Sequence, residues 1–73
     1  MRKIIYSIDH RLLVERLKKA RRDAGLDQTT AARLLGKSQS YISKIEAGQR
    51  RIDIIQLKQF AKIYKKDLDF FLK

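Results

Sequence analysis

A polar stripe on the segment from Gln39 to Ala47 is the part of the sequence best suited to recognition chemistry. If this segment is a helix, the i, i+3, i+4, i+7 positions of one face carry Ser40, Ser43, Lys44 and Ala47. Hydroxyl and ammonium groups form hydrogen bonds, and the short side chains of serine and alanine allow close approach. The stripe therefore indicates a surface that a partner other than solvent contacts.

Capping residues and glycines indicate which elements position this stripe. Each of five segments begins with a plausible N-cap, and three of them end at a glycine. We expect a first helix from the cap Asp9 to about Ala24, a second over 28–35, a third over 39–47, a fourth that follows Asp53 and keeps helical spacing to Tyr64, and a last one over 68–72. Residues 1–8, rich in β-branched and aromatic side chains, read as a short extended arm or strand.

Composition supports an all-α fold. The 73-residue chain has no proline, no cysteine and only three glycines, and it is rich in good helix formers. Such a chain has room for a single core. We therefore expect a short N-terminal arm at 1–8 and one compact five-helix bundle over 9–73.

Charge narrows the class of partner. Lys and Arg number 18 against 8 Asp and Glu, a net charge of +10, which favours a polyanion, either nucleic acid or an anionic membrane surface. No apolar run is long enough to span a bilayer, and the apolar start is too short for a secretory signal, so we expect a cytoplasmic protein. Basic amphipathic helices can bind a membrane surface, but helices separated by glycines favour a folded bundle, so we expect no membrane binding.

The second and third helices have the pattern of a helix-turn-helix unit. Gly36 supplies the positive φ of the turn, and Ala32 is small enough for the point where the helices cross. Ile42 and Ile45 then anchor the third helix to the core and leave its polar face outward. We expect that face to enter a DNA major groove, where Gln39 can pair with adenine. The other base-reading side chains are then Ser40, Ser43 and Lys44.

From about Leu13 to Leu72 the chain resembles the phage-repressor-like, Cro/Xre-type helix-turn-helix proteins. The matching residues are Leu17 through Arg21, Gly25-Leu26-Asp27-Gln28, Ala32, Leu35-Gly36, Ser38-Gln39-Ser40, Ile42-Ser43-Lys44-Ile45-Glu46, Gly48, Leu57, Ala61 and Asp67-Leu68-Asp69-Phe70-Phe71. The resemblance implies a five-helix fold of the lambda-repressor-like DNA-binding type.

The resemblance also implies residue roles. Gln28 is similar to a glutamine that contacts phosphate and braces the first residue of the recognition helix, here Gln39. Arg21 and Glu46 match a pair that forms an internal salt bridge. The expected contacts to the DNA backbone come from Gln28, Lys37, Tyr41, Gln49, Arg50 and Arg51.

Four positions depart from the family pattern. Ile52 stands where many members have proline, and Ala31 is smaller than the usual leucine. Lys37 replaces an apolar turn residue, which adds a charge for a phosphate contact. Lys65 stands where a glycine often ends the fourth helix, so that helix either runs on or ends in a strained conformation.

The leading functional hypothesis is a sequence-specific transcriptional repressor that binds a palindromic operator as a homodimer. The alternative is a protein-interaction module, such as one with an antitoxin-like protein partner, that binds DNA only weakly and without sequence preference. An enzyme finds almost no support, because we find no glycine-rich phosphate loop, no metal-ligand cluster and no evident catalytic carboxylate pair. We expect no cofactor and no metal, and the only histidine, His10, reads as a solvated or capping residue.

Overall fold

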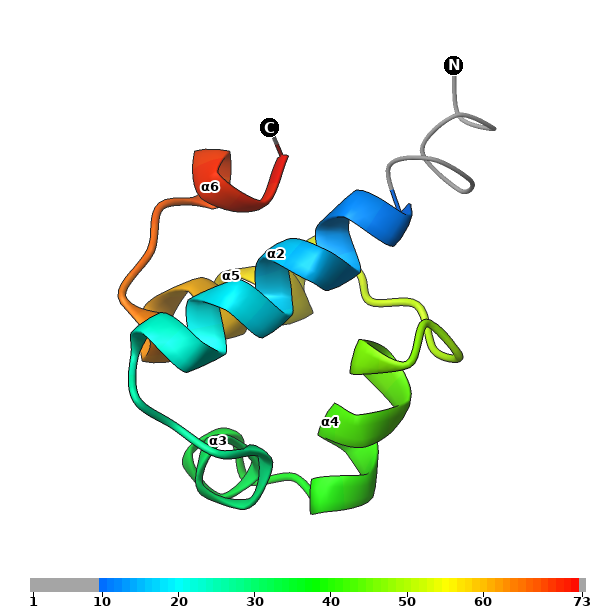
Figure 1. The fold of residues 1–73 in the computed structure, drawn as a ribbon, viewed down its shortest axis with the longest axis vertical. Coiled ribbons are helices and arrows are strands. Elements are labelled where there is room, and N and C mark those ends of the chain that lie inside the picture. The colour runs from blue at the N-terminus through cyan, green and yellow to red at the C-terminus, as the bar shows by residue number, and fades with distance from the viewer. Residues whose placement is uncertain (1–9, 73) are drawn as a thin grey trace.

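The computed structural model describes residues 10–72, which form five helices (Figure 1). In chain order they are α2 (His10–Asp23), α3 (Gln28–Leu35), α4 (Gln39–Glu46), α5 (Ile54–Tyr64) and α6 (Leu68–Leu72). No β-strand occurs in residues 10–72. The expected all-α, five-helix class is confirmed, whereas the predicted arm at 1–8 and the cap at Asp9 lie outside the described residues.

Side-chain caps begin the three central helices. The Asp27 carboxylate accepts a hydrogen bond of 2.8 Å from the Thr30 backbone N–H at the start of α3. At α5, Asp53 and Gln56 form a capping box in which each side chain accepts from the other's backbone N–H. Ser38 caps α4 through its hydroxyl. These caps satisfy N–H groups that the helices themselves leave without partners, and so they set the helix starts.

Two helices end slightly earlier than the sequence indicates. α2 ends at Asp23, and α4 ends at Glu46. Ala47 is the C-cap of α4, with φ −84° and ψ −3°, and Gly48 follows in the left-handed region at φ 77°. Ala47 keeps a right-handed backbone and its N–H still donates to the Ser43 carbonyl, so the chain turns away from the helix at Gly48.

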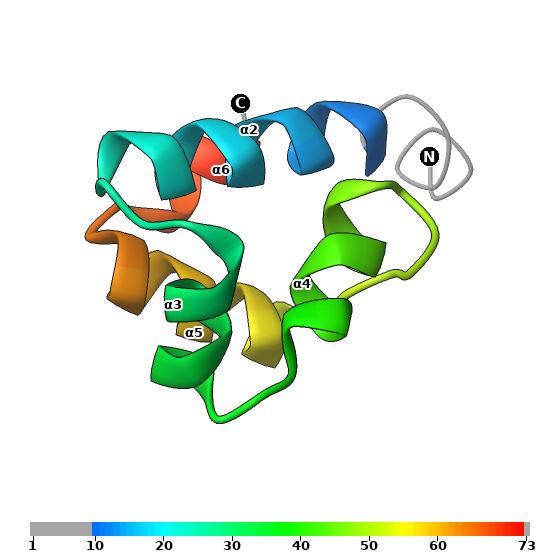
Figure 2. The ribbon, with the colours of Figure 1, turned by 60° about the horizontal axis from the view of Figure 1, so that its bottom comes forward.

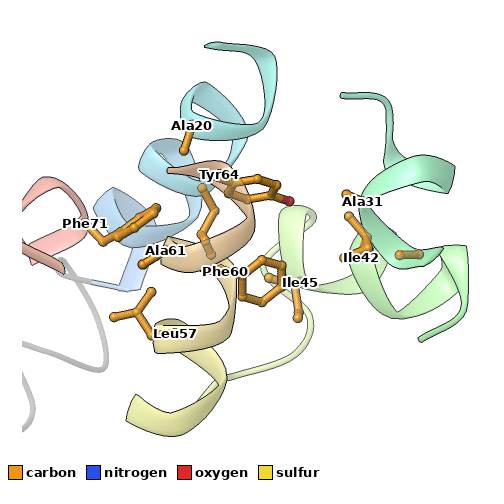
Figure 3. Packing of buried hydrophobic residues seen from close by; sticks show 11 residues of the cluster. Ala20, Ala31, Ile42, Ile45, Leu57, Phe60, Ala61, Tyr64 and Phe71 are labelled. Carbon is orange, nitrogen blue, oxygen red and sulfur yellow. The ribbon is translucent and has the colours of Figure 1, made fainter. Parts of the chain in front are cut away.

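The five helices α2 to α6 of the described residues all contribute to the core, and α5 supplies the most buried side chains (Figures 1 and 3). Phe60 and Tyr64 of α5 are each 2% exposed, and Figure 3 shows Phe60 beside Ile45 of α4. From α3, two alanines are buried and Leu35 packs against the core partly buried. The buried side chains are Leu17, Ala20, Ala31, Ala32, Ile42, Ile45, Leu57, Phe60, Ala61, Tyr64 and Phe71.

α5 ends at a lysine in a left-handed conformation. Lys65 has φ 59° and ψ 47°, and within residues 10–72 it is the only residue other than glycine with positive φ. The following N–H, of Lys66, donates to the Ala61 carbonyl at 3.0 Å, which closes the helix. Of the two outcomes expected from the missing glycine, the strained end is the one that occurs.

Some large apolar side chains remain on the surface. Ile54 keeps the helical spacing of the α5 core residues, but it is 52% exposed because it lies in the first turn, beyond the edge of the core. Leu34, Ile55 and Leu72 are exposed as well. Within residues 10–72, no helix combines the length and the apolar character needed to cross a membrane.

Candidate nucleic-acid interface

α3 and α4 are joined by the three residues 36–38 and form one corner of the molecule (Figure 2). Gly36 has φ 71°, and the Lys37 N–H donates to the Ala32 carbonyl at 2.9 Å. Ala32 is 2% exposed. The left-handed glycine reverses the chain direction, and the small alanine side chain allows the two helices to pack closely.

α4 has one buried face and one exposed polar face. Ile42 and Ile45 are each 1% exposed, so they fix the helix to the core. Gln39, Ser40 and Lys44 are exposed, while Ser43 is half-buried. The structure therefore places all four predicted base-reading residues on one short helix, and three of them are exposed.

Arg21 and Glu46 hold the C-terminal end of α4 against α2. The Arg21 Nε donates to Glu46 Oε2 at 2.7 Å and Nη2 donates to Oε1 at 3.0 Å, a bidentate pair. Arg21 Nη1 also donates to the Leu26 carbonyl at 2.9 Å. Only 13% of the Arg21 side chain and 6% of the Glu46 side chain are exposed. The hydrogen bond to Glu46 raises the pKa of Arg21, so the guanidinium stays charged.

Two glutamines extend this pair to the start of α4. Gln28 Nε2 donates to Glu46 Oε1 at 3.0 Å, and Gln39 Nε2 donates to Gln28 Oε1 at 2.6 Å. The resemblance implied the contact between the glutamines. The contact from Gln28 to Glu46 was not expected, and its only signal in the sequence is that a buried carboxylate needs more than one donor.

Two basic side chains lie close to the ring of Tyr41 on α4. The Lys37 ammonium lies 5.3 Å from the centre of the Tyr41 ring, and the Arg50 guanidinium lies 5.0 Å from it. The ring itself stacks on Phe60, with the planes 3° apart. Partial burial raises the pKa of Tyr41, so its hydroxyl is a neutral donor. Sequence reasoning named these three residues separately but did not predict their cluster.

The segment after α4 adds further polar groups. Gln49, Arg50 and Arg51 are exposed, and the Gln49 N–H donates to the Lys44 carbonyl at 2.9 Å. Ile52, which replaces the family's proline, is half-buried and packs against the core. The segment is thus attached at both ends and presents its basic side chains next to α4.

A short helix with a buried apolar face, an exposed polar face and flanking cations, joined through a glycine turn to a second helix, defines a DNA-binding protein of the helix-turn-helix class. The chain belongs to the Cro/Xre-type helix-turn-helix family, since the family model described as Helix-turn-helix matches residues 17–71. It is therefore a DNA-binding transcription regulator. The predicted family resemblance is confirmed.

One solved structure is similar over nearly the whole chain. It is the restriction-modification controller protein C.AhdI from Aeromonas hydrophila, with 28% sequence identity and a TM-score of 0.80, and the match covers 92% of this chain and 96% of that chain. No curated protein sequence matches the chain.

Proposed function

We propose that the chain is a repressor that reads a specific operator by placing α4 in the DNA major groove. The observation that carries this proposal is the exposed polar face of α4, which is backed by buried Ile42 and Ile45 and tied down by the Arg21–Glu46 pair. A rigid helix with short polar side chains fits a groove about 12 Å wide.

Gln39 and Lys44 carry most of the base reading. Gln39 pairs with adenine through N6 and N7, and Lys44 donates to guanine O6 and N7. Ser40 and Ser43 contact either a base or a phosphate. All four lie on α4, so one approach of the helix brings them to successive base pairs.

The cluster around Tyr41 contacts phosphates on the flank of the groove. Lys37 and Arg50 both contact the Tyr41 ring, so this one residue holds two cations at the flank of α4. Arg51 and Gln49 continue this surface, and Gln28 lies at the N-terminus of α3, where the helix dipole favours a phosphate. The net charge of +10 adds a non-specific attraction that falls steeply with salt.

The operator is palindromic and the protein binds it as a homodimer, with half-sites ~34 Å apart or a multiple of that distance. One short helix contacts too few base pairs for tight specific binding, so a second copy is needed. Ile55 and Leu72, which are 65% and 62% exposed, supply apolar surface for the dimer on the C-terminal side. Bound over a promoter, the dimer represses by blocking RNA polymerase.

The similarity to a controller protein favours one biological context among several. A phage regulator, an antitoxin and a restriction-modification controller would all use this mechanism. Because the match covers 92% of this chain and 96% of C.AhdI, we favour control of restriction-modification genes.

In-vitro selection from random duplex DNA at physiological salt tests this function. Wild type is expected to enrich an inverted repeat, and the Gln39→Ala, Lys44→Ala double variant is expected to lose or shift it. Lys19→Ala, which removes an exposed lysine of α2 outside the helix-turn-helix unit, is the control for lost charge and should keep the wild-type repeat. If wild type enriches no sequence, the operator function is wrong and a protein-interaction module takes its place.

Light scattering after size exclusion tests the dimer. Leu72→Asp is expected to give a monomer with weaker operator binding, because a charge is costly to bury in an interface. Leu34→Asp is the matched control, since Leu34 is 57% exposed on α3. A Leu72→Asp protein that remains dimeric would show that the copies meet elsewhere.

A further inference from the structure

A chain of side-chain hydrogen bonds runs from the interior of the protein to the expected base-reading glutamine. It passes from Arg21 to Glu46 at 2.7 and 3.0 Å, from Gln28 to Glu46 at 3.0 Å, and from Gln39 to Gln28 at 2.6 Å. The carboxylate of Glu46 allows a single role, because it accepts hydrogen bonds and cannot donate them, just as the guanidinium of Arg21 can only donate.

That single role sets the direction of both amides. Glu46 requires a donor from Gln28, so the Gln28 Nε2 points inward and its Oε1 points outward. The outward oxygen requires a donor from Gln39, so the Gln39 Nε2 turns toward Gln28. Gln39 then keeps its Oε1 and one N–H of Nε2 for a base.

One acceptor and one donor match adenine and not guanine. Adenine offers an N6–H donor and the N7 acceptor in the major groove, whereas guanine offers two acceptors, O6 and N7. An amide in the opposite orientation would direct both N–H groups of Gln39 outward, and those would suit guanine.

We propose that Glu46 is a positioning residue for base choice. Through Gln28 it fixes the amide of Gln39 in the orientation that selects adenine over guanine. This inference rests on the proposed operator function. It gives the Arg21–Glu46 pair a role in specificity in addition to its structural one.

Paired operators that differ only at the base read by Gln39 provide the test. That base is the position at which the Gln39→Ala variant loses its preference in the selection. Wild type is expected to bind the adenine operator on the order of tenfold more tightly than the guanine operator. Gln28→Met keeps the Arg21–Glu46 pair but removes the link, so the ratio of the two affinities should fall to about one.

The ratio separates positioning from a general loss of binding. Lys37→Ala, a loss of an expected phosphate contact, is the control that should weaken both operators equally and leave the ratio unchanged. Gln28→Lys gives the sharpest outcome, because an ammonium can only donate and would turn the Gln39 oxygen inward. This variant is expected to prefer guanine.

Glu46→Gln tests directly whether the carboxylate sets the direction of the hydrogen bonds, since a neutral amide can either accept or donate. The ratio of the affinities for the adenine and guanine operators should fall in this variant as well. Thermal melting shows whether Glu46→Gln is folded. If it is unfolded, the two Gln28 variants decide the question. A wild-type ratio retained by Gln28→Met, or a Gln28→Lys protein that still prefers adenine, would overturn the inference while leaving the operator function intact. Failure of wild type to select any operator would overturn both.

Discussion

Removing one partner of the Arg21–Glu46 pair should destabilise the fold strongly. In Arg21→Met the carboxylate of Glu46, with only 6% of its side chain exposed, loses both guanidinium contacts and keeps only the Gln28 amide. A buried charge without its partner costs about 3–5 kcal/mol. We expect about 3 kcal/mol, because Gln28 remains as a donor.

That loss is large for a domain of this size. A 73-residue chain has a free energy of unfolding of about 4–11 kcal/mol. Urea denaturation followed by circular dichroism at neutral pH measures the loss, and thermal melting should show a midpoint lower by more than about 10 °C.

The double variant Arg21→Met, Glu46→Leu separates the stranded charge from lost packing. With both charges absent, its stability should return to within about 1 kcal/mol of wild type, which is about 2–3 kcal/mol above that of Arg21→Met. The surface pair Lys19–Asp23, 3.8 Å apart with side chains 61% and 39% exposed, is the control, and Lys19→Met should cost less than about 0.5 kcal/mol. A loss below about 1 kcal/mol in Arg21→Met would refute the reasoning, because it would mean that solvent screens the pair.

Further predictions concern the helix ends, the core and the flank of α4. Lys65→Gly should raise the free energy of unfolding by about 1 kcal/mol, since glycine adopts the φ of 59° without strain; an unchanged urea midpoint would contradict this. Asp53→Ala should cost about 1 kcal/mol and Asp53→Asn much less in the same assay, because asparagine also caps; equal losses would mean that the cap is not what matters. Tyr64→Phe should leave stability unchanged or raise it, since the buried Tyr64 hydroxyl has no hydrogen-bond partner in residues 10–72; a loss of 1 kcal/mol or more would point to a missed bond. Arg50→Ala should weaken binding to all DNA sequences alike and reduce the slope of log affinity against log salt by about 1, whereas Lys19→Ala should not.

The helix positions could be predicted from the sequence because local chemistry sets them. Asp27, Ser38 and Asp53 cap their helices as their types indicate, and the bounds of α3 agree with the prediction at both ends. Caps and left-handed glycines act within a few residues. For the same reason the exposed polar face of α4, which carries the predicted base-reading residues, could be predicted from helical spacing.

The contacts between helices could not be predicted in the same way. Whether Gln28 reaches Glu46, and whether Lys37 and Arg50 meet at Tyr41, depends on how three separate segments pack. The left-handed backbone conformation of Lys65 could not be predicted either. A lysine adopts this conformation only when the surrounding hydrogen bonds require it. These features are set by tertiary packing, so only the structure reveals them.

Cleavage of DNA by a tethered iron chelate tests most directly whether α4 lies in the major groove. The sequence contains no cysteine, so Ala47→Cys gives one attachment site at the end of α4, and Lys62→Cys gives a matched site on α5. On the selected operator, the chelate at position 47 is expected to cleave both strands around the major groove of each half-site, with much weaker cleavage from position 62. Equal cleavage from both positions, or cleavage from position 62 alone, would contradict the placement of α4 in the groove.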